Sequence, residues 1–150
     1  MTNRLKKTKF HHQPGQSMIE FALILPLMVL VVVGIFELGR AFFAYIAISN
    51  AAREGARIYT FSPDTTTIAQ INTTVSTEIG NQTLVDPNNI ASIVIKCGNT
   101  YGVVDTKLKL DACPSEQPIR VTVTYSHKLI LGGFFSQPLL LVRSAEMMKP

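Results

Sequence analysis

The chain has 150 residues, which leaves room for one membrane anchor and one small domain and excludes a large multidomain protein. Its formal net charge of +4 owes much to a basic N-terminus (Arg4, Lys6, Lys7 and Lys9), whereas the later basic residues are scattered among acids. A nucleic-acid-binding protein would gather its basic residues on the folded domain, so no nucleic-acid partner is expected.

Residues 1–15 form a basic and polar leader without an acidic residue. Positively charged segments tend to stay on the cytoplasmic side of a membrane, so we expect the leader to be cytoplasmic and the C-terminal part to be carried across. The leader ends in Gly15, a small residue at which a peptidase could cut before Gln16. Cleavage there would create an amine about one helical turn from the carboxylate of Glu20.

The segment from Ser17 to Phe36 is apolar and carries one charge, Glu20. About 20 residues of helix cross the hydrocarbon core, which predicts a transmembrane helix at about residues 17–37 and places Glu37 at the far interface. A cleaved secretory signal has a similar basic start and apolar core. This run is long for a signal core, and no small-x-small cleavage site follows it, which favours an uncleaved span.

Helical periodicity continues beyond the span, so residues 16–60 are predicted to form one long helix with an amphipathic second half. Its predicted apolar stripe must be buried on the protein's own domain or on a neighbouring helix. The stripe consists of Leu38, Phe42, Tyr45, Ser49, Ala52, Ala56 and Tyr59. Arg40 lies one turn beyond Glu37 and is expected to pair with it. The charged residues that are candidates for an interface on this helix are Glu37, Arg40, Arg53, Glu54 and Arg57.

Residues 61–150 are predicted to form a small extracytoplasmic α+β domain. A weaker helical pattern covers residues 65–79. Three strand candidates follow at residues 91–97, 119–125 and 139–148, and the second alternates most clearly between apolar and polar side chains. We expect a small antiparallel sheet built from these strands to bury one face on the second half of the long helix.

The two cysteines, Cys97 and Cys113, both fall on the side predicted to be exported. A disulfide between them would suit an oxidising compartment and would close a loop of about fifteen residues, worth roughly 3 kcal/mol. A metal site is a weaker alternative because two thiols without CxxC spacing or a nearby histidine make a poor ligand set. Two unpaired thiols remain the third interpretation.

No catalytic or metal-binding constellation is recognisable in the sequence. Beyond the leader there is a single histidine, His127, in or just after a predicted strand. A Ser/His/Asp arrangement would need partners that cannot be placed, so His127 is expected to be structural or solvated. We therefore expect no enzymatic activity, no cofactor, no metal and no small-molecule substrate.

The connection from Leu129 to Phe135 is apolar, although connections usually run over the surface. It is expected either to form an exposed patch for a partner or the membrane, or to fold back into the core of the small domain.

The run Gly15-Gln16-Ser17-Met18-Ile19-Glu20-Phe21 resembles the processing site of type IV pilins. The Glu20-Phe21 pair and the short leader are most similar to the Flp/Tad (type IVb) branch. Three later stretches extend the resemblance to the TadE-like minor pilins or pseudopilins: Ala22 to Leu27, Gly34 to Arg40 and Asn50 to Arg57. The resemblance covers roughly a third of the chain, from Gly15 to Arg57, and implies a pilin-like fold.

The resemblance implies that a prepilin peptidase removes the leader between Gly15 and Gln16, with Glu20 and Phe21 serving in processing and assembly. The product would be a single-pass protein of the bacterial inner membrane that contributes to assembly of an adhesive Tad pilus. Its implied partners are the membrane, the peptidase, other pilins and Tad assembly proteins. The alternative is an anchored protein that never polymerises and whose periplasmic domain scaffolds an envelope or secretion complex.

Overall fold

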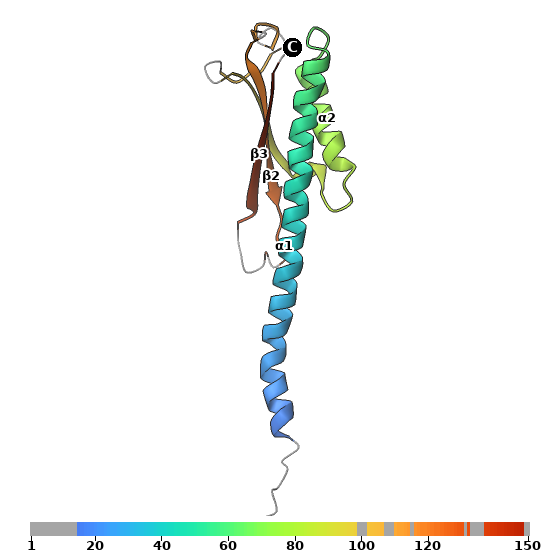
Figure 1. The fold of residues 1–150 in the computed structure, drawn as a ribbon. Coiled ribbons are helices and arrows are strands. Elements are labelled where there is room, and N and C mark those ends of the chain that lie inside the picture. The colour runs from blue at the N-terminus through green and yellow to red at the C-terminus, as the bar shows by residue number, and fades with distance from the viewer. Residues whose placement is uncertain are drawn as a thin grey trace, which may run out of the picture. The chain divides into compact units, whose positions relative to one another are not determined.

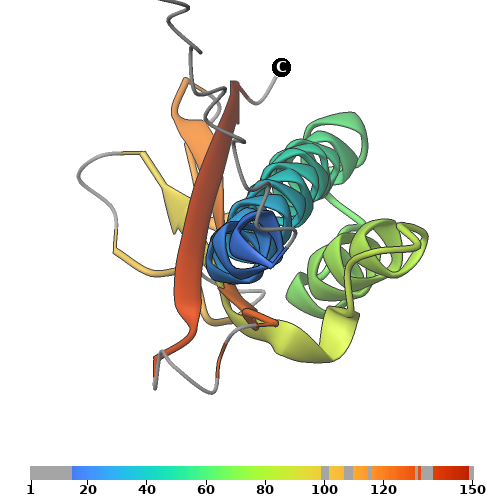
Figure 2. The same ribbon diagram turned by 90° about the horizontal axis from the view of Figure 1, so that it is seen from below.

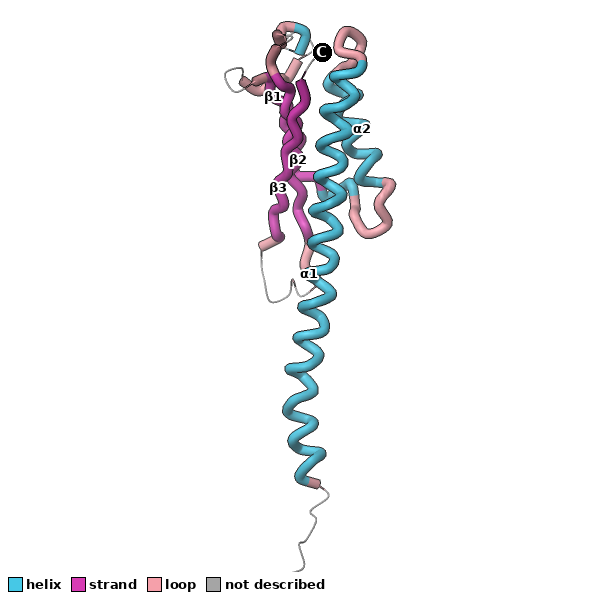
Figure 3. The backbone as a smooth tube through the Cα atoms, in the orientation of Figure 1, coloured by secondary structure: helices cyan, strands magenta, loops and turns pink. Residues whose placement is uncertain are grey.

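The computed structural model describes residues 15–98, 102–106, 110–114, 116–130, 132 and 137–148. The chain divides into two compact units, with the boundary between Phe36 and Glu37. Helix α1, Gln16–Phe61, begins in the first unit and supplies the longest element of the second. The remaining elements belong to the second unit (Figures 1 and 3).

The second half of α1 forms one side of the domain core. Its buried residues are mostly small: Ala44, Ala47, Ile48, Ala51, Ala52, Gly55, Ala56 and Tyr59. Of the predicted stripe, Ala52, Ala56 and Tyr59 are buried on the domain itself, whereas Leu38, Phe42 and Tyr45 are exposed. Burial of these three side chains on a neighbouring helix stays a prediction. Alanine and glycine allow a helix backbone to approach the elements beside it closely, so the face that packs here is rich in small side chains rather than large ones.

Helix α2, Ile68–Gly80, packs beside α1 and begins three residues later than predicted. Thr67 is its N-cap: the Thr67 hydroxyl accepts a hydrogen bond from the Gln70 N–H, and the Gln70 side chain accepts one from the Thr67 N–H. This reciprocal capping box fixes where the helix can start. A short 3-10 helix, η1, Pro87–Asn89, then leads into the sheet.

The sheet contains three antiparallel strands in the order β1-β2-β3. They are β1, Ile90–Cys97, β2, Pro118–His127, and β3, Leu139–Met148. The central strand β2 buries every second residue from Ile119 to His127, as its alternating sequence predicts. Figure 2 shows α2 and the second half of α1 on the same face of this sheet. The predicted α+β, pilin-like architecture, a long N-terminal apolar helix packed on a small antiparallel sheet, is thus confirmed.

Gly55 lies where α1, α2 and the sheet come together. A Cβ atom at this position would lie 2.7 Å from Cγ2 of Val75 in α2, and 3.4 Å from side-chain atoms of Ile71 and of Val121 in β2. The helices and the sheet therefore share one core, and a side chain at Gly55 would have to displace part of it.

Candidate functional site

The predicted processing segment lies at the start of α1. The helix begins at Gln16, and Gly15 is an exposed turn residue with open space around its Cα. The Gln16 side-chain amide donates a hydrogen bond to Oε1 of Glu20 at 3.3 Å, so the first turn brings positions 16 and 20 together. Phe21 is also exposed. Leader residues 1–14 lie outside the described part of the chain, so the predicted cleavage stays a prediction.

The first half of α1 has an apolar surface without a protein partner among the described residues. Its large apolar side chains from Met18 to Phe36 include fourteen that are 44–75 % exposed. By length and composition this helix could cross a membrane, with a mean hydropathy of 2.7 in its most apolar window. An N-terminal signal sequence has the same properties, so the finding supports either an anchor or a signal and shows no topology.

The point at which the second unit begins is a buried polar junction. Glu37 is 8 % exposed; its Oε2 pairs with Arg40 at 3.0 Å, and its Oε1 accepts a hydrogen bond from the Ile130 N–H at 2.7 Å. The expected Glu37–Arg40 pair is therefore present. Sequence reasoning missed the third partner, Ile130, because it lies in the connection after β2, far from Glu37 in the chain.

His127 lies buried at the same junction, and its Nε2 has no hydrogen-bond partner among the residues that the structure describes. Burial lowers the pKa of His127, the positive charge of Arg40 lowers it further, and Glu37 opposes them. The buried position agrees with the expected structural role. The signal that could have revealed it is the alternation of β2: extending the buried series Ile119 to Tyr125 by two residues reaches His127.

The other charged residues of the predicted interface helix lie on its exposed side. Arg57 forms two hydrogen bonds to the carboxylate of Glu54, at 2.8 and 2.6 Å, and its guanidinium lies 5.5 Å from the centre of the Phe61 ring. The hydrogen bonds from Arg57 lower the pKa of Glu54. Arg53 is exposed as well. Their availability to a partner is consistent with an interface, which stays a prediction.

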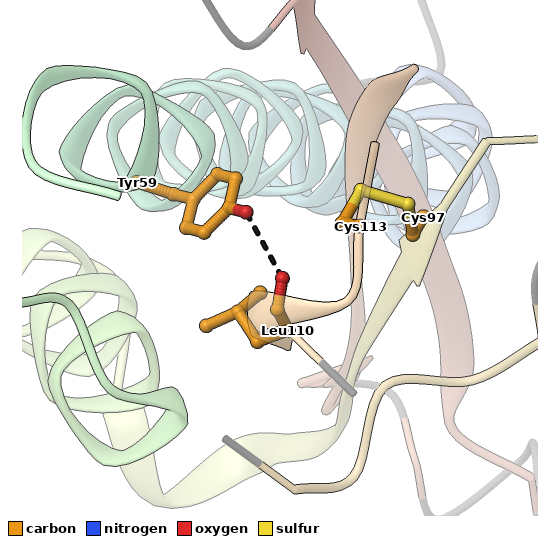
Figure 4. Close-up of a disulfide and its surroundings, with 4 residues drawn as sticks. All are labelled: Tyr59, Cys97, Leu110 and Cys113. Atoms are coloured by element: carbon orange, nitrogen blue, oxygen red, sulfur yellow. Dashed lines mark hydrogen bonds between the residues drawn. A yellow bond between two sulfur atoms is a disulfide. The ribbon is translucent and has the colours of Figure 1, made fainter. Parts of the chain in front are cut away.

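The cysteines form a disulfide, as one of the three sequence interpretations predicted. Cys97, at the end of β1, is bonded to Cys113, with their Cα atoms 5.8 Å apart, and both residues are buried. Nearby, the Tyr59 hydroxyl of α1 donates a hydrogen bond to the Leu110 carbonyl at 3.1 Å (Figure 4). Burial, and then the charges of Asp111 and Asp64, raise the pKa of Tyr59. The disulfide-closed segment is thus fastened to the last turns of α1.

The apolar connection after β2 is exposed where the structure describes it. Ile130 is 58 % exposed, Leu129 is half-buried, and the Gly132 N–H donates to the Leu129 carbonyl in a turn. Leu131 and Gly133 to Phe135 lie outside the described residues. For Ile130 the surface interpretation is right.

Residues 15–57 match the family model described as TadE-like protein. This segment of the chain is TadE-like. The match begins at Gly15, the residue before α1, and ends at Arg57, four residues before the helix ends, so the TadE-like segment corresponds closely to α1. No curated protein and no solved structure matches the chain.

The TadE-like assignment implies involvement in Tad pilus biogenesis and association with the Tad pilus machinery. TadE-like proteins are pilus components rather than enzymes. Within the described residues, no group of three or more His, Cys, Asp or Glu side chains is arranged to hold a metal ion.

Proposed function

We propose that the chain is a membrane-anchored minor pilin or pseudopilin that contributes to Tad pilus assembly and surface adhesion. A prepilin peptidase cleaves it between Gly15 and Gln16, its N-terminus is cytoplasmic, and residues 61–150 are extracytoplasmic. The observation that carries this proposal is that three features coincide at the start of α1. The TadE-like match starts at Gly15, α1 starts at Gln16, and Glu20 lies one turn into an otherwise uncharged apolar segment.

The exposed apolar half of α1 supports a membrane anchor that remains in the mature protein, in contrast to a cleaved signal. Fourteen large apolar side chains exposed to water would be very unfavourable, at about 25 cal/mol for each Å². A bilayer covers such a helix before assembly, and the apolar segments of neighbouring subunits cover it in a filament. Pro26 lies within the helix, as is tolerated in membrane spans.

The disulfide supports an extracytoplasmic location for the domain. Disulfides persist in oxidising compartments and are rare in the cytoplasm. Cys97 and Cys113 are bonded and buried, so the domain core is built around the oxidised pair. A fold of this kind is suited to the far side of the inner membrane.

Glu20 is proposed to neutralise an N-terminal amine, its own in the bilayer or a neighbour's in the assembly. A charged side chain costs on the order of 2.5 to 3.5 kcal/mol at the centre of a membrane helix, and less near the interface. The contact between the Gln16 and Glu20 side chains supports this pairing because it places residue 16 within reach of the carboxylate. Pairing with a neighbour would also set the axial register between adjacent helices, as a buried polar group does in coiled coils.

Processing is tested by determining the N-terminus of the protein extracted from membranes. It should begin at Gln16 in cells with an active prepilin peptidase. The Gly15→Leu variant should keep the Met1 start, whereas Gly39→Leu, at another open glycine of α1, should be cleaved normally. An intact Met1 start in the wild type would refute the cleavage.

The role of Glu20 is tested with the Glu20→Gln variant, which keeps the size of the side chain and removes its charge. It should be inserted and cleaved but fail to support piliation and adhesion. Glu116→Gln is the matched control, since it makes the same change at an exposed position of the domain, outside the predicted interface helix. If Glu20→Gln is processed and supports normal pili, Glu20 is only a helix-start charge. If deletion of the whole chain leaves pili intact, the non-polymerising scaffold becomes the better account.

A further inference from the structure

Exposed apolar side chains gather at one end of the domain. Leu38 and Phe42 on α1, Ile130 after β2, and Leu139 and Leu140 at the start of β3 are 44–66 % exposed. Leu139 pairs with His127 and Leu140 with Ser126 in the sheet register, so these strand ends lie together. Leu38 and Phe42 line a shallow hollow with Leu141 of β3, which brings helix and strand to one surface. We call these five side chains the basal face.

The junction at Glu37 fixes the level of the basal face along α1. The Ile130 N–H donates to Oε1 of Glu37 at 2.7 Å, so the connection after β2 lies at the height of the first residue of the domain unit. Phe42 is five residues further along the helix, about 8 Å. The headgroup region of a bilayer is about 5–8 Å thick on each side. If the span ends at Glu37, the rise along α1 from that end to Phe42 is no greater than the thickness of that region.

The charges at this end favour a lipid surface. In residues 37–46, 126–130 and 137–142 the only acid is Glu37, which is buried and paired with Arg40. Lys128 is exposed, and the Arg143 guanidinium lies 4.5 Å from the centre of the Tyr45 ring. Aromatic rings with basic side chains around an apolar surface are typical of protein segments at the membrane interface.

We infer that the basal face contacts the anionic lipid surface from which α1 emerges, and gives the domain a second membrane contact beside its anchor. The inference rests on the membrane anchoring proposed above. Ile130, Leu139 and Leu140 enter the headgroup region, and Arg40 and Lys128 face the lipid phosphates. Burying apolar area in this way restrains the domain against the bilayer, because each exposed side chain gains by leaving water.

The test uses the absence of tryptophan from the chain. Single tryptophans are introduced into the full chain by Ile130→Trp and Leu140→Trp, on the basal face. Val31→Trp reports on the span, and Phe61→Trp lies 24 residues beyond Glu37 in α1, about 36 Å away. All four positions are exposed, so none of the substitutions displaces the core. The variants are reconstituted in vesicles of phosphatidylethanolamine and phosphatidylglycerol that carry brominated acyl chains.

Bromine should quench the tryptophan fluorescence of the Val31→Trp, Ile130→Trp and Leu140→Trp variants several-fold more than that of Phe61→Trp. Replacing the phosphatidylglycerol with phosphatidylcholine should weaken quenching at the two basal positions; unchanged quenching would overturn the role given to the basic side chains. If bromine quenches the fluorescence of Val31→Trp but not that of the two basal variants, the inference is overturned and the proposed anchor stands. No quenching at any position would refute the anchor too. The emission of the two basal tryptophans could instead shift to the blue without quenching, by an amount that grows with the protein-to-lipid ratio. That result would show that a second copy of the chain covers the basal face, and it would overturn the lipid contact.

Discussion

The two halves of α1 differ in how their apolar residues are used. From Met18 to Phe36 the helix displays large side chains on all sides, and none of its described residues is buried. From Ala44 to Tyr59 the buried residues are mainly alanine and glycine, and they face α2 and the sheet. One continuous helix thus combines a segment of high hydropathy with a segment that packs closely.

The comparison shows that apolar content alone does not reveal where a helix is buried. The first half is more apolar, yet none of its described residues is buried, whereas the second half is buried through small residues. The small side chains let the backbone of α1 approach α2 and the sheet closely, as at Gly55. Substitutions in the two halves should therefore have very different effects on the stability of the domain.

The largest effect is expected from Ile48→Ala in the packed half. Ile48 is fully buried, and truncating such a side chain costs about 2–5 kcal/mol of unfolding free energy. Ile24→Ala, in the exposed half, should change the value by no more than about 0.5 kcal/mol. Urea unfolding of the detergent-solubilised full chain, followed by near-UV circular dichroism, measures both. Equal losses would mean that the two halves are packed alike.

Removing the disulfide is expected to have the next largest effect, confined to the packed region. The Cys97→Ala/Cys113→Ala double variant should lose about 3 kcal/mol of unfolding free energy, because its unfolded chain gains the entropy of an open loop. Reduction of the wild type should cause a similar loss, while the helicity of residues 16–36 stays unchanged. A reduced protein as stable as the oxidised one would show that the bond contributes nothing.

Gly55→Ala tests the close packing of the second half of α1 at a single contact. Alanine favours a helix over glycine by up to about 1 kcal/mol, so Gly39→Ala, where a Cβ meets nothing within 4 Å, should stabilise the protein. At Gly55 the new Cβ would lie 2.7 Å from Val75, whose β-branched side chain is stiff, and we expect a net loss of about 1–3 kcal/mol. The same unfolding assay applies, and a gain at both glycines would refute the close approach.

The smallest effect is expected from the pH dependence at the junction. Burial and Arg40 hold the pKa of His127 below its usual 6.5, so the unfolded state takes up a proton at a higher pH than the folded state. The stability contributed at neutral pH is therefore lost as the pH falls below 6.5 and through the lowered pKa. His127→Gln should flatten this part of the profile between pH 7 and 5. A wild-type stability that rises on acidification, with no change in the variant, would contradict the assignment.

The sequence was sufficient where a feature depends on local pattern. The alternation of β2 placed Ile119 to Tyr125 inward, and helical periodicity predicted an end near residue 60, one residue before the observed end at Phe61. The start of α2 was missed, although Thr67 and Gln70 carry the capping-box pattern that determines it. The Cys97–Cys113 bond was one of three interpretations, since spacing alone cannot choose among them.

Long-range contacts could not be predicted from local pattern. Glu37 meets Ile130 because the register of β2 against β3 and the packing of α1 bring the two together, and neither is visible in a short stretch of sequence. The side of α1 that the domain covers depends on long-range packing in the same way. Leu38 and Phe42 belong to the periodic stripe but are exposed, whereas Ala44 and Ala47 outside that stripe are buried.

The bond from Tyr59 to the Leu110 carbonyl has a mechanical consequence. It fastens the last turns of α1 to the segment closed by the disulfide, while Ala44 to Ala56 lie packed along the core beneath it. A tensile load entering the domain through α1 would run along the helix axis and act on these contacts in shear. Contacts loaded in shear share the force instead of breaking one after another. The hydrogen bond from Tyr59 therefore holds the C-terminal end of α1 against the domain when the helix is pulled.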